Sequence, residues 1–308
     1  MSVQKTVIKV KNLVKKYGKL NAVDDVSFSV QKGEVFGLLG ENGAGKTTTL
    51  EIIEGLRRAT SGEVEVLGHN IREANGRVKQ KIGVQLQSSA YYQFLTLKEI
   101  LSLFCKFYGA CTDPMELLDM VDLKDKANSY VGKLSGGQKQ RFSIVASLVN
   151  DPEIVFLDEP TTGLDPLARR NLWGLISKIK AQGKTIILTT HYMEEAELLC
   201  DRVAIMEKGK ILALNETHKL IENAKIPYTI SFSINKVDKK IFEKVLKFGE
   251  IENVFGRVKQ FELRIKNAKD LASALDEVRK LKPESFTVGR ATLEEIFIEL
   301  TGKTIGED

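Results

Sequence analysis

The sequence predicts an α/β fold with a mostly parallel core sheet, followed by a small α+β domain. Three features of its 308 residues support this prediction. A glycine-rich loop lies between a strand pattern and a helix pattern near residue 40, and two short apolar runs flank a helix between residues 154 and 190. The alternation of apolar residues then changes character around residues 225–227. We therefore expect a first domain over residues 1–225 and a second over residues 226–308.

The start of the chain predicts a β-rich subdomain. Three short strands, VIKVKNLV, AVDDVSFSV and EVFGLLG, are separated by turns at Gly18 and Gly33. The third strand leads into the glycine-rich loop, and Leu50, Ile53 and Leu56 recur at helical spacing after it. This order predicts a strand, a loop and a helix in direct succession.

The middle of the chain predicts a helical lobe and then a β-α-β unit. Residues 95–148 are mostly helical in pattern, with Thr96 and Glu99 spaced as a capping box and a second helix starting after two glycines at 136–137. The runs EIVFLD and TIILTT flank the helix PLARRNLWGLISKIKAQG. Short apolar runs of this kind are typical of buried parallel strands.

The remainder of the chain predicts a separate accessory domain. Its segments read as strand, helix, strand, strand, helix, strand and a final helix, from YTISFSI to TLEEIFIEL. The first six elements match the ferredoxin-like β-α-β-β-α-β order. The pattern assigns no activity to this domain.

Composition and charge exclude several classes of protein. The residues are 43% hydrophobic and 28% charged, as in globular domains, and the net charge is only +5 without a basic arm. A nucleic-acid partner is therefore not expected, because phosphate binding calls for clustered positive charge. No stretch of about 18 consecutive apolar residues occurs, so a membrane role is expected to require a partner protein.

The glycine-rich loop carries the first chemical motif, GENGAGKT, at residues 40–47. It matches the G-x-x-x-x-G-K-T pattern of a P-loop, in which backbone N–H groups and a helix N-terminus face a polyphosphate. Lys46 would supply positive charge at the β- and γ-phosphates, and Thr47 would ligate magnesium. The residues expected to bind the nucleotide here are Gly40, Asn42, Gly43, Ala44, Gly45, Lys46, Thr47 and Thr48.

Two carboxylates at the end of the strand EIVFLD form the second motif. Beside a P-loop, Asp158 is expected to help hold Mg²⁺, directly or through water, and Glu159 to polarise the attacking water. In isolation the same residues would be read as an acidic turn closed by Pro160. The P-loop favours the catalytic interpretation, and with it hydrolysis.

The third motif is LSGGQ, with Ser135, Gly136, Gly137 and Gln138 at a helix start. It would form a second anion-binding nest, which a nucleotide already held by Lys46 does not require. This motif resembles the signature of ATP-binding cassette (ABC) proteins. The resemblance continues through FLDEPTTGLDP and LTTHYMEEAELLCDRVAIMEKGKI and covers roughly residues 6–220. It implies the fold of an ABC nucleotide-binding domain, with a β-rich subdomain, a core sheet and a helical lobe.

The resemblance implies roles for four further residues, each with a structural alternative. Tyr17 would stack on adenine, or be a half-buried loop aromatic. Gln87 would contact Mg²⁺ and the membrane partner, or be a surface amide, and His191 would contact the γ-phosphate, or be a buried core histidine. Asp165 would act across a dimer interface and also looks like a helix N-cap followed by proline.

The family's mechanism implies a homodimer in which two ATP molecules lie between the P-loop of one chain and Ser135 to Gln138 of the other. The ending GRATLEEIFIELTG resembles ATPase subunits of bacterial ABC-2 or drug exporters. We therefore expect a subunit that drives export through a separate transmembrane permease, at the cytoplasmic face of the plasma membrane. A soluble ABC ATPase acting on ribosomes or nucleic acid is the alternative, and a P-loop kinase or GTPase ranks last because neither explains LSGGQ.

Overall fold

The chain is divided into two compact units, Met1–Glu216 and Thr217–Asp308. The computed structural model describes residues 5–73, 75–86, 91–109, 112–234, 239–254 and 260–302. The boundary expected after residue 225 falls inside the second unit, because helix α8 (Thr217–Glu222) packs against α11 (Leu293–Thr301). Contacts between elements far apart in sequence therefore set the boundary, and local alternation does not reveal them.

The β-rich subdomain is an antiparallel sheet in the order β2-β1-β4-β5. The two strands expected from VIKVKNLV and AVDDVSFSV are present, and each extends beyond its segment at both ends. The strands are β1 (Thr6–Tyr17), β2 (Leu20–Gln31), β4 (Ser61–Val66) and β5 (His69–Asn70).

The core sheet has the order β10-β9-β3-β8-β7-β6. Neighbouring strands are parallel except β9 and β10, which are antiparallel. Every residue of β3, β7 and β8 is buried, which explains why apolar residues follow one another in them without alternating with exposed polar residues. The expected mostly parallel sheet is confirmed. Its strands are β3 (Val35–Leu39), β6 (Ile82–Gln85), β7 (Ile154–Asp158), β8 (Thr185–Thr190), β9 (Arg202–Glu207) and β10 (Lys210–Glu216).

Helix α1 (Lys46–Ile53) follows the glycine-rich loop, as expected. Its buried Ile52 and Ile53 belong to one apolar cluster with Val10 of β1, Phe36 of β3 and Phe156 of β7. The two sheets therefore share a single core that includes α1, and this core holds the start of α1 at the carboxyl ends of the parallel strands.

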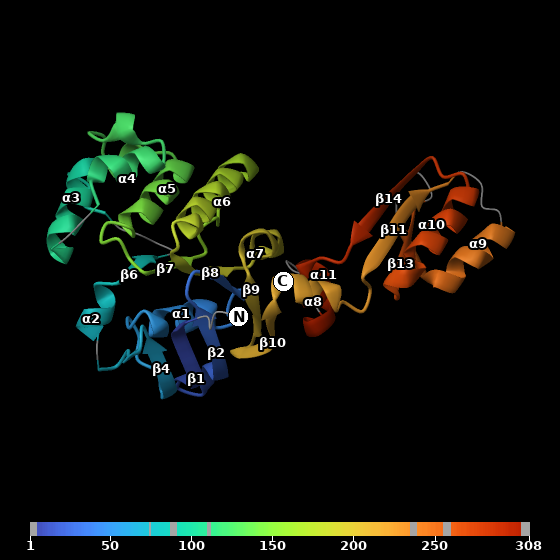
Figure 1. The fold of residues 1–308 in the computed structure, drawn as a ribbon, viewed down its shortest axis with the longest axis horizontal. Coiled ribbons are helices and arrows are strands. Elements are labelled where there is room, and N and C mark those ends of the chain that lie inside the picture. Colours follow the sequence, from blue (N-terminus) through green and yellow to red (C-terminus); the bar gives the residue numbers. More distant parts are fainter. Residues whose placement is uncertain are drawn as a thin grey trace. The chain divides into compact units, whose positions relative to one another are not determined.

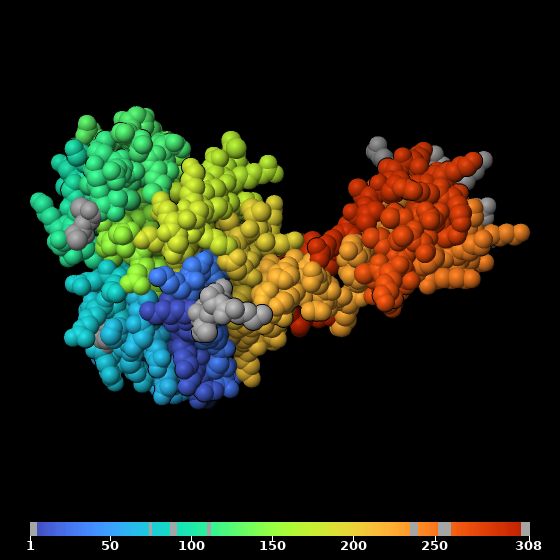
Figure 2. Space-filling model, viewed as in Figure 1, coloured from blue at the N-terminus to red at the C-terminus, as the bar shows by residue number. Residues whose placement is uncertain are grey.

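The helical lobe contains α3 (Leu97–Tyr108), α4 (Pro114–Met120) and α5 (Gly136–Ala146). These helices gather on one side of the core strands, away from β1, β2 and β4 (Figure 1). In the space-filling view the green lobe and the blue β-rich part form separate regions of the first unit (Figure 2). The capping box of Thr96 and Glu99 is present at the start of α3. The described part of this unit also contains α2 (Asn75–Lys79), α6 (Pro166–Ala181), α7 (Met193–Leu199) and two short 3-10 helices.

The second unit has a four-stranded antiparallel sheet in the order β12-β13-β11-β14. Apolar residues of β11 and β13 form a core with α10. This strand order and the β-α-β-β-α-β succession are those expected for a ferredoxin-like arrangement. The elements are β11 (Tyr228–Ser233), α9 (Lys239–Val245), β12 (Gly249–Val254), β13 (Gln260–Ile265), α10 (Leu271–Lys280), β14 (Ser285–Arg290) and α11.

Candidate active site

The glycine-rich loop folds back between β3 and α1 because its glycines adopt conformations that other residues avoid. Gly45 is the N-cap of α1 with φ 98°, in the left-handed region. A Cβ on Gly45 would lie 2.4 Å from the carbonyl oxygen of Ala22, so the position admits no side chain. The loop consequently places the N-terminus of α1, with its unpaired N–H groups, at the floor of a cleft.

Lys46, the first residue of α1, is only 4% exposed. Its ammonium donates to the carbonyl oxygens of Gly40 (2.8 Å) and Glu41 (3.0 Å), and lies 3.4 Å from Oε1 of Glu159. Burial lowers the pKa of Lys46, while the charges of Glu159 and Asp158 oppose that shift. The loop and the end of β7 are thus joined through one buried ammonium group.

Asp158, the last residue of β7, forms an oxygen-rich pair with Thr47. Its Oδ1 accepts hydrogen bonds from the hydroxyls of Thr47 (3.1 Å) and Thr189. Burial raises the pKa of Asp158, and the two hydroxyls oppose the shift. A carboxylate and a hydroxyl side by side are ligands that Mg²⁺ prefers. These residues therefore fit the metal that the P-loop implies.

Glu159 lies directly after β7 with φ 46°, which is uncommon for a residue other than glycine. Its N–H donates to Oγ1 of Thr189 at 2.9 Å, which fixes this turn against the neighbouring strand β8. The carboxylate accepts from Thr162 Oγ1 at 3.1 Å, and its Oε2 lies 3.3 Å from Nδ1 of His191. His191 follows β8, so the parallel strands β7 and β8 deliver the acid and the imidazole to one edge of the sheet.

Lys46, Thr47, Glu159 and His191 border one cleft with a volume of about 960 Å³, whereas the expected residues Gly40, Ala44 and Asp158 do not line it. The expected residues that line it are Tyr17, Asn42, Gly43, Gly45, Lys46, Thr47, Thr48, Glu159 and His191. Leu20, Asn21, Ala22, Thr162 and Lys208 line it as well and were not expected. The signal for Lys208 is its place in the Lys-Gly turn between β9 and β10, but only the fold brings that turn to the P-loop.

Tyr17 ends strand β1 and is 41% exposed. Two cations lie near its ring, Lys15 Nζ at 5.0 Å and the guanidinium carbon of Arg57 at 5.6 Å from the centroid. An exposed aromatic ring at the rim of the cleft can stack on a base. The alternative of a half-buried loop aromatic does not describe Tyr17, because the residue belongs to a strand.

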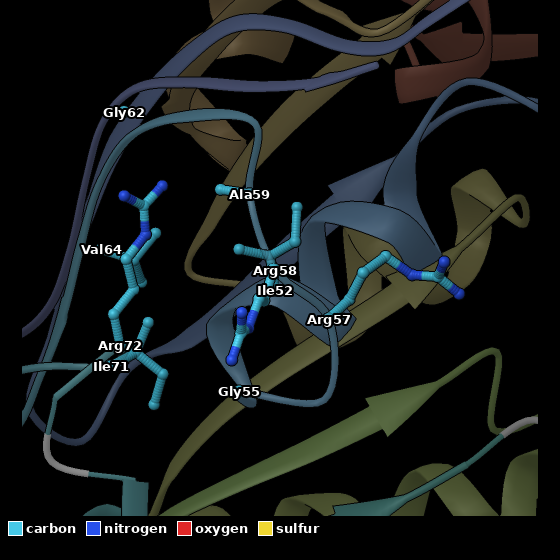
Figure 3. Close-up of a pocket in the computed structure, with 9 residues that line it drawn as sticks. All are labelled: Ile52, Gly55, Arg57, Arg58, Ala59, Gly62, Val64, Ile71 and Arg72. Atoms are coloured by element: carbon cyan, nitrogen blue, oxygen red, sulfur yellow. The ribbon is translucent and has the colours of Figure 1, made fainter. Parts of the chain in front are cut away.

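A second pocket, of about 420 Å³, lies at the other end of α1 (Figure 3). Ile52, Val64 and Ile71 line it, together with Arg58 and Arg72. The side chain of Arg57 also contributes, but its guanidinium points away from the other two arginines (Figure 3). None of the expected site residues lines this pocket, so it is distinct from the nucleotide cleft.

The LSGGQ motif and Asp165 lie at two helix N-termini and do not line the cleft of their own chain. Ser135 caps α5, and it forms a reciprocal capping box with Gln138. Asp165 caps α6 by accepting from the backbone N–H groups of Leu167 (3.0 Å) and Ala168 (2.9 Å), which confirms the expected N-cap. Gln87 lies outside the described residues.

The fold and the cleft define a class of protein. A P-loop at a strand-helix junction, a Thr-Asp pair for a metal and a glutamate at the same strand end are the parts of a P-loop nucleoside triphosphatase.

Within the part of the chain that the structure describes, no helix has the length and apolarity needed to cross a bilayer.

Comparison with known proteins shows the family. The family model described as "ABC transporter" matches residues 23–162. A linearmycin resistance ATP-binding protein of Bacillus subtilis is 35% identical, over 97% of this chain and 99% of that protein. A Nod factor export ATP-binding protein I of Burkholderia orbicola is 42% identical, over 69% of this chain and 72% of that protein. The chain belongs to the ATP-binding subunits of ABC transporters, and its relatives are of the exporter type.

Solved structures agree with this assignment. The ATP-binding subunit of an ABC transporter is 32% identical with a TM-score of 0.64, over 70% of this chain and 92% of that structure. A dimeric ATP-binding cassette in a post-hydrolysis state, bound to ADP and Pi, is 28% identical with a TM-score of 0.62, over 68% of this chain and 98% of that structure. The chain is therefore an ATP-binding ATPase with the cassette fold.

Proposed function

We propose that this protein hydrolyses ATP to drive export through a separate transmembrane subunit, and that closure of two copies around ATP is the driving step. The observation that carries the proposal is the position of Glu159. One carboxylate oxygen lies by the buried ammonium of Lys46 and the other by the imidazole of His191. A carboxylate beside a loop that binds polyphosphate is positioned to orient an attacking water molecule.

The nucleotide would be held by the loop and by residues at its rim. Backbone N–H groups of Gly40 to Thr48 would face the phosphates, with Lys46 supplying positive charge. Tyr17 would stack on the adenine, since its exposed ring lines the cleft. His191, which lies beside Glu159 and lines the same cleft, would contact the γ-phosphate.

Thr47 and Asp158 would hold Mg²⁺, with Gln87 as a third ligand from the segment after β6. When bound, the ion neutralises phosphate charge and orients the phosphoryl group. The chain's own contribution is to align Asp158 through the hydroxyls of Thr47 and Thr189, which also oppose the rise that burial causes in its pKa. Glu159 would then act as the general base toward water.

A second copy would complete each site with Ser135, Gly136, Gly137, Gln138 and Asp165. Three observations support this proposal. These residues do not line the cleft of their own chain, and they lie at the N-termini of α5 and α6, where backbone N–H groups favour anions. One of the structural relatives is a dimer bound to ADP and Pi. ATP would favour the closed dimer only through its differential affinity for that state.

The transmembrane partner would be an ABC-2 type permease, and the protein would lie at the cytoplasmic face of the plasma membrane through that partner. Two relatives carry names that refer to Nod factor export and linearmycin resistance. These names favour export, while the cargo would be recognised by the membrane subunit.

Co-purification tests this function against a soluble ABC ATPase acting on ribosomes or nucleic acid. Tagged Glu159→Gln protein is isolated with ATP from gently solubilised membranes, and mass spectrometry identifies what accompanies it. We expect a multi-spanning membrane protein in stoichiometric amount. Ribosomal proteins or nucleic acid without any membrane protein would replace the export proposal with the alternative.

A further inference from the structure

Helix α6 contacts the segment that carries His191 through an aromatic and a cationic side chain. The guanidinium carbon of Arg169, on α6, lies 4.1 Å from the ring centroid of Tyr192. The Tyr192 ring in turn lies 4.1 Å from that of His191, with an angle of 42° between the planes. A cation this close to an aromatic face is attracted to it, most strongly where water is excluded.

One nitrogen of the Arg169 guanidinium lacks a hydrogen bond to the described residues. Its Nε is buried and has no hydrogen-bond partner within the described part of the chain. Tyr192 is the N-cap residue of α7, but its side chain makes no capping hydrogen bond. The backbone N–H of Tyr192 donates to Oγ1 of Thr190 at 2.9 Å, while its ring contacts Arg169 and His191.

A buried carboxylate also links helix α6 to helix α7 by a hydrogen bond. Glu195, in the first turn of α7, is completely buried and accepts a hydrogen bond from Trp173 Nε1 of α6 at 3.0 Å. Burial raises the pKa of Glu195, and the charge of Arg169 is among the interactions that oppose the shift. The guanidinium of Arg169 thus lies over the ring of Tyr192, and its charge also acts on the buried carboxylate of Glu195.

The same helix begins at the residue expected to face a second copy. Asp165 caps α6, and the N–H of Arg169 donates to the carbonyl oxygen of Asp165 at 2.9 Å. Arg169 lies one turn further along the helix. Any displacement of the first turn of α6 therefore moves Arg169 with it.

We propose that Arg169 and Tyr192 are positioning residues that hold His191 against Glu159, so that the placement of the first turn of α6 controls hydrolysis. This inference rests on the role of His191 proposed above. Neither side chain lines the cleft, so their effect on turnover acts through His191. Binding of ATP depends on the loop and needs neither residue.

The test measures kcat and KM of ATP hydrolysis, ATP affinity and thermal unfolding for variants of the full chain. Arg169→Ala and Tyr192→Leu should each lower kcat about tenfold, with KM and ATP affinity nearly unchanged. Tyr192→Phe should retain activity because it keeps the ring, and Arg169→Lys should fall between wild type and Arg169→Ala. Arg170→Ala, an exposed neighbour on the same helix, is the matched control.

The double variant Arg169→Ala/Tyr192→Leu distinguishes positioning from general stability. Two residues acting on His191 through one contact should be non-additive, so the second substitution should add little to the loss caused by the first. Additive losses, a rise in KM instead of a fall in kcat, or a loss that follows the unfolded fraction would overturn the inference. His191→Ala is measured alongside. Full activity of that variant would refute the proposed role of His191 itself, whereas loss in His191→Ala with normal Arg169→Ala activity would refute only the positioning inference.

Discussion

Lys46 and Glu159 form a buried ion pair, with 3.4 Å between Nζ and Oε1 and side-chain exposures of 4% and 6%. The pair joins the P-loop to the end of β7. Removing one member of a buried pair leaves the other charge uncompensated, so the effects of substitution at either residue extend beyond its own contacts. ATP affinity, turnover and stability must therefore be measured separately for both residues.

Glu159→Gln should lower kcat by about 10²–10⁴-fold while ATP is still bound, because an amide cannot accept a proton from water. The variant should also accumulate as a dimer in the presence of ATP, which size-exclusion chromatography detects. Glu153→Gln, at the opposite end of β7 on the surface, is the control and should behave like wild type. Undiminished hydrolysis in Glu159→Gln would disprove the assignment of the base.

Lys46→Ala should weaken ATP binding by about 10- to 100-fold, because a charged donor to the polyphosphate is lost. Lys208→Ala should weaken binding by a smaller factor, since Lys208 lines the same cleft but is exposed to solvent. Fluorescence titration with a labelled nucleotide measures both. Equal affinities for Lys46→Ala and wild type would show that the ammonium does not contact the phosphates.

Gly45→Ala should destabilise the protein more than Gly43→Ala. Both residues have positive φ, 98° and 82°, and each alanine would incur about 1–2 kcal/mol of backbone strain. A Cβ at Gly43 meets open space, whereas at Gly45 it lies 2.4 Å from Ala22 O. Urea unfolding of the two variants should differ by about 1–3 kcal/mol. Equal stabilities would show that the loop adapts to a Cβ at Gly45.

Ser135→Arg should bind ATP normally yet fail to form the ATP-dependent dimer in the Glu159→Gln background. A long cation at the proposed interface would block the partner's nucleotide. Thr96→Arg is the matched control, since it also removes a capping box in the helical lobe and should cost a similar ~1 kcal/mol of stability. Normal dimers from Ser135→Arg would contradict the proposed closure.

Glu54 should make the protein less stable as the pH rises. Both of its carboxylate oxygens are buried and have no hydrogen-bond partner among the described residues, and burial, with the charges of Asp158 and Glu51, raises its pKa to about 8. Between its ordinary pKa of 4.5 and about 8 the folded state holds more protons than the unfolded state. Stability from this group is therefore full below the lower value and declines by up to about 1.4 kcal/mol per pH unit across the window.

Glu54→Gln should remove this dependence and gain stability relative to wild type as the pH is raised. Urea midpoints measured at about pH 5 and about pH 8 check the prediction, with the exposed Glu63→Gln as control. A variant whose stability relative to wild type is the same at both pH values would rule out Glu54 as the origin of the effect.

Much of the fold follows from local sequence. The buried strands β7 and β8, the helix after the P-loop and the capping residues Thr96 and Asp165 all lie where their patterns indicate. Each of these features depends on residues that are close together in sequence. The spacing of apolar residues indicates which face of a strand or helix is buried, and the capping residue supplies the hydrogen bonds at the helix start. Local alternation does not show that α8 belongs to the second unit, because α8 joins that unit through its packing on α11.

The sequence by itself determined the P-loop, the order of the strands and helices, and the resemblance to the ABC family. Only the tertiary structure decided that Glu159 lies between Lys46 and His191, that Lys208 and Ala22 border the cleft, and that Arg169 contacts Tyr192. A motif identifies residues with related chemistry at fixed spacing along the chain. Distances between side chains far apart in sequence depend on the pairing of parallel strands and on how closely the helices pack, and no local pattern contains that information.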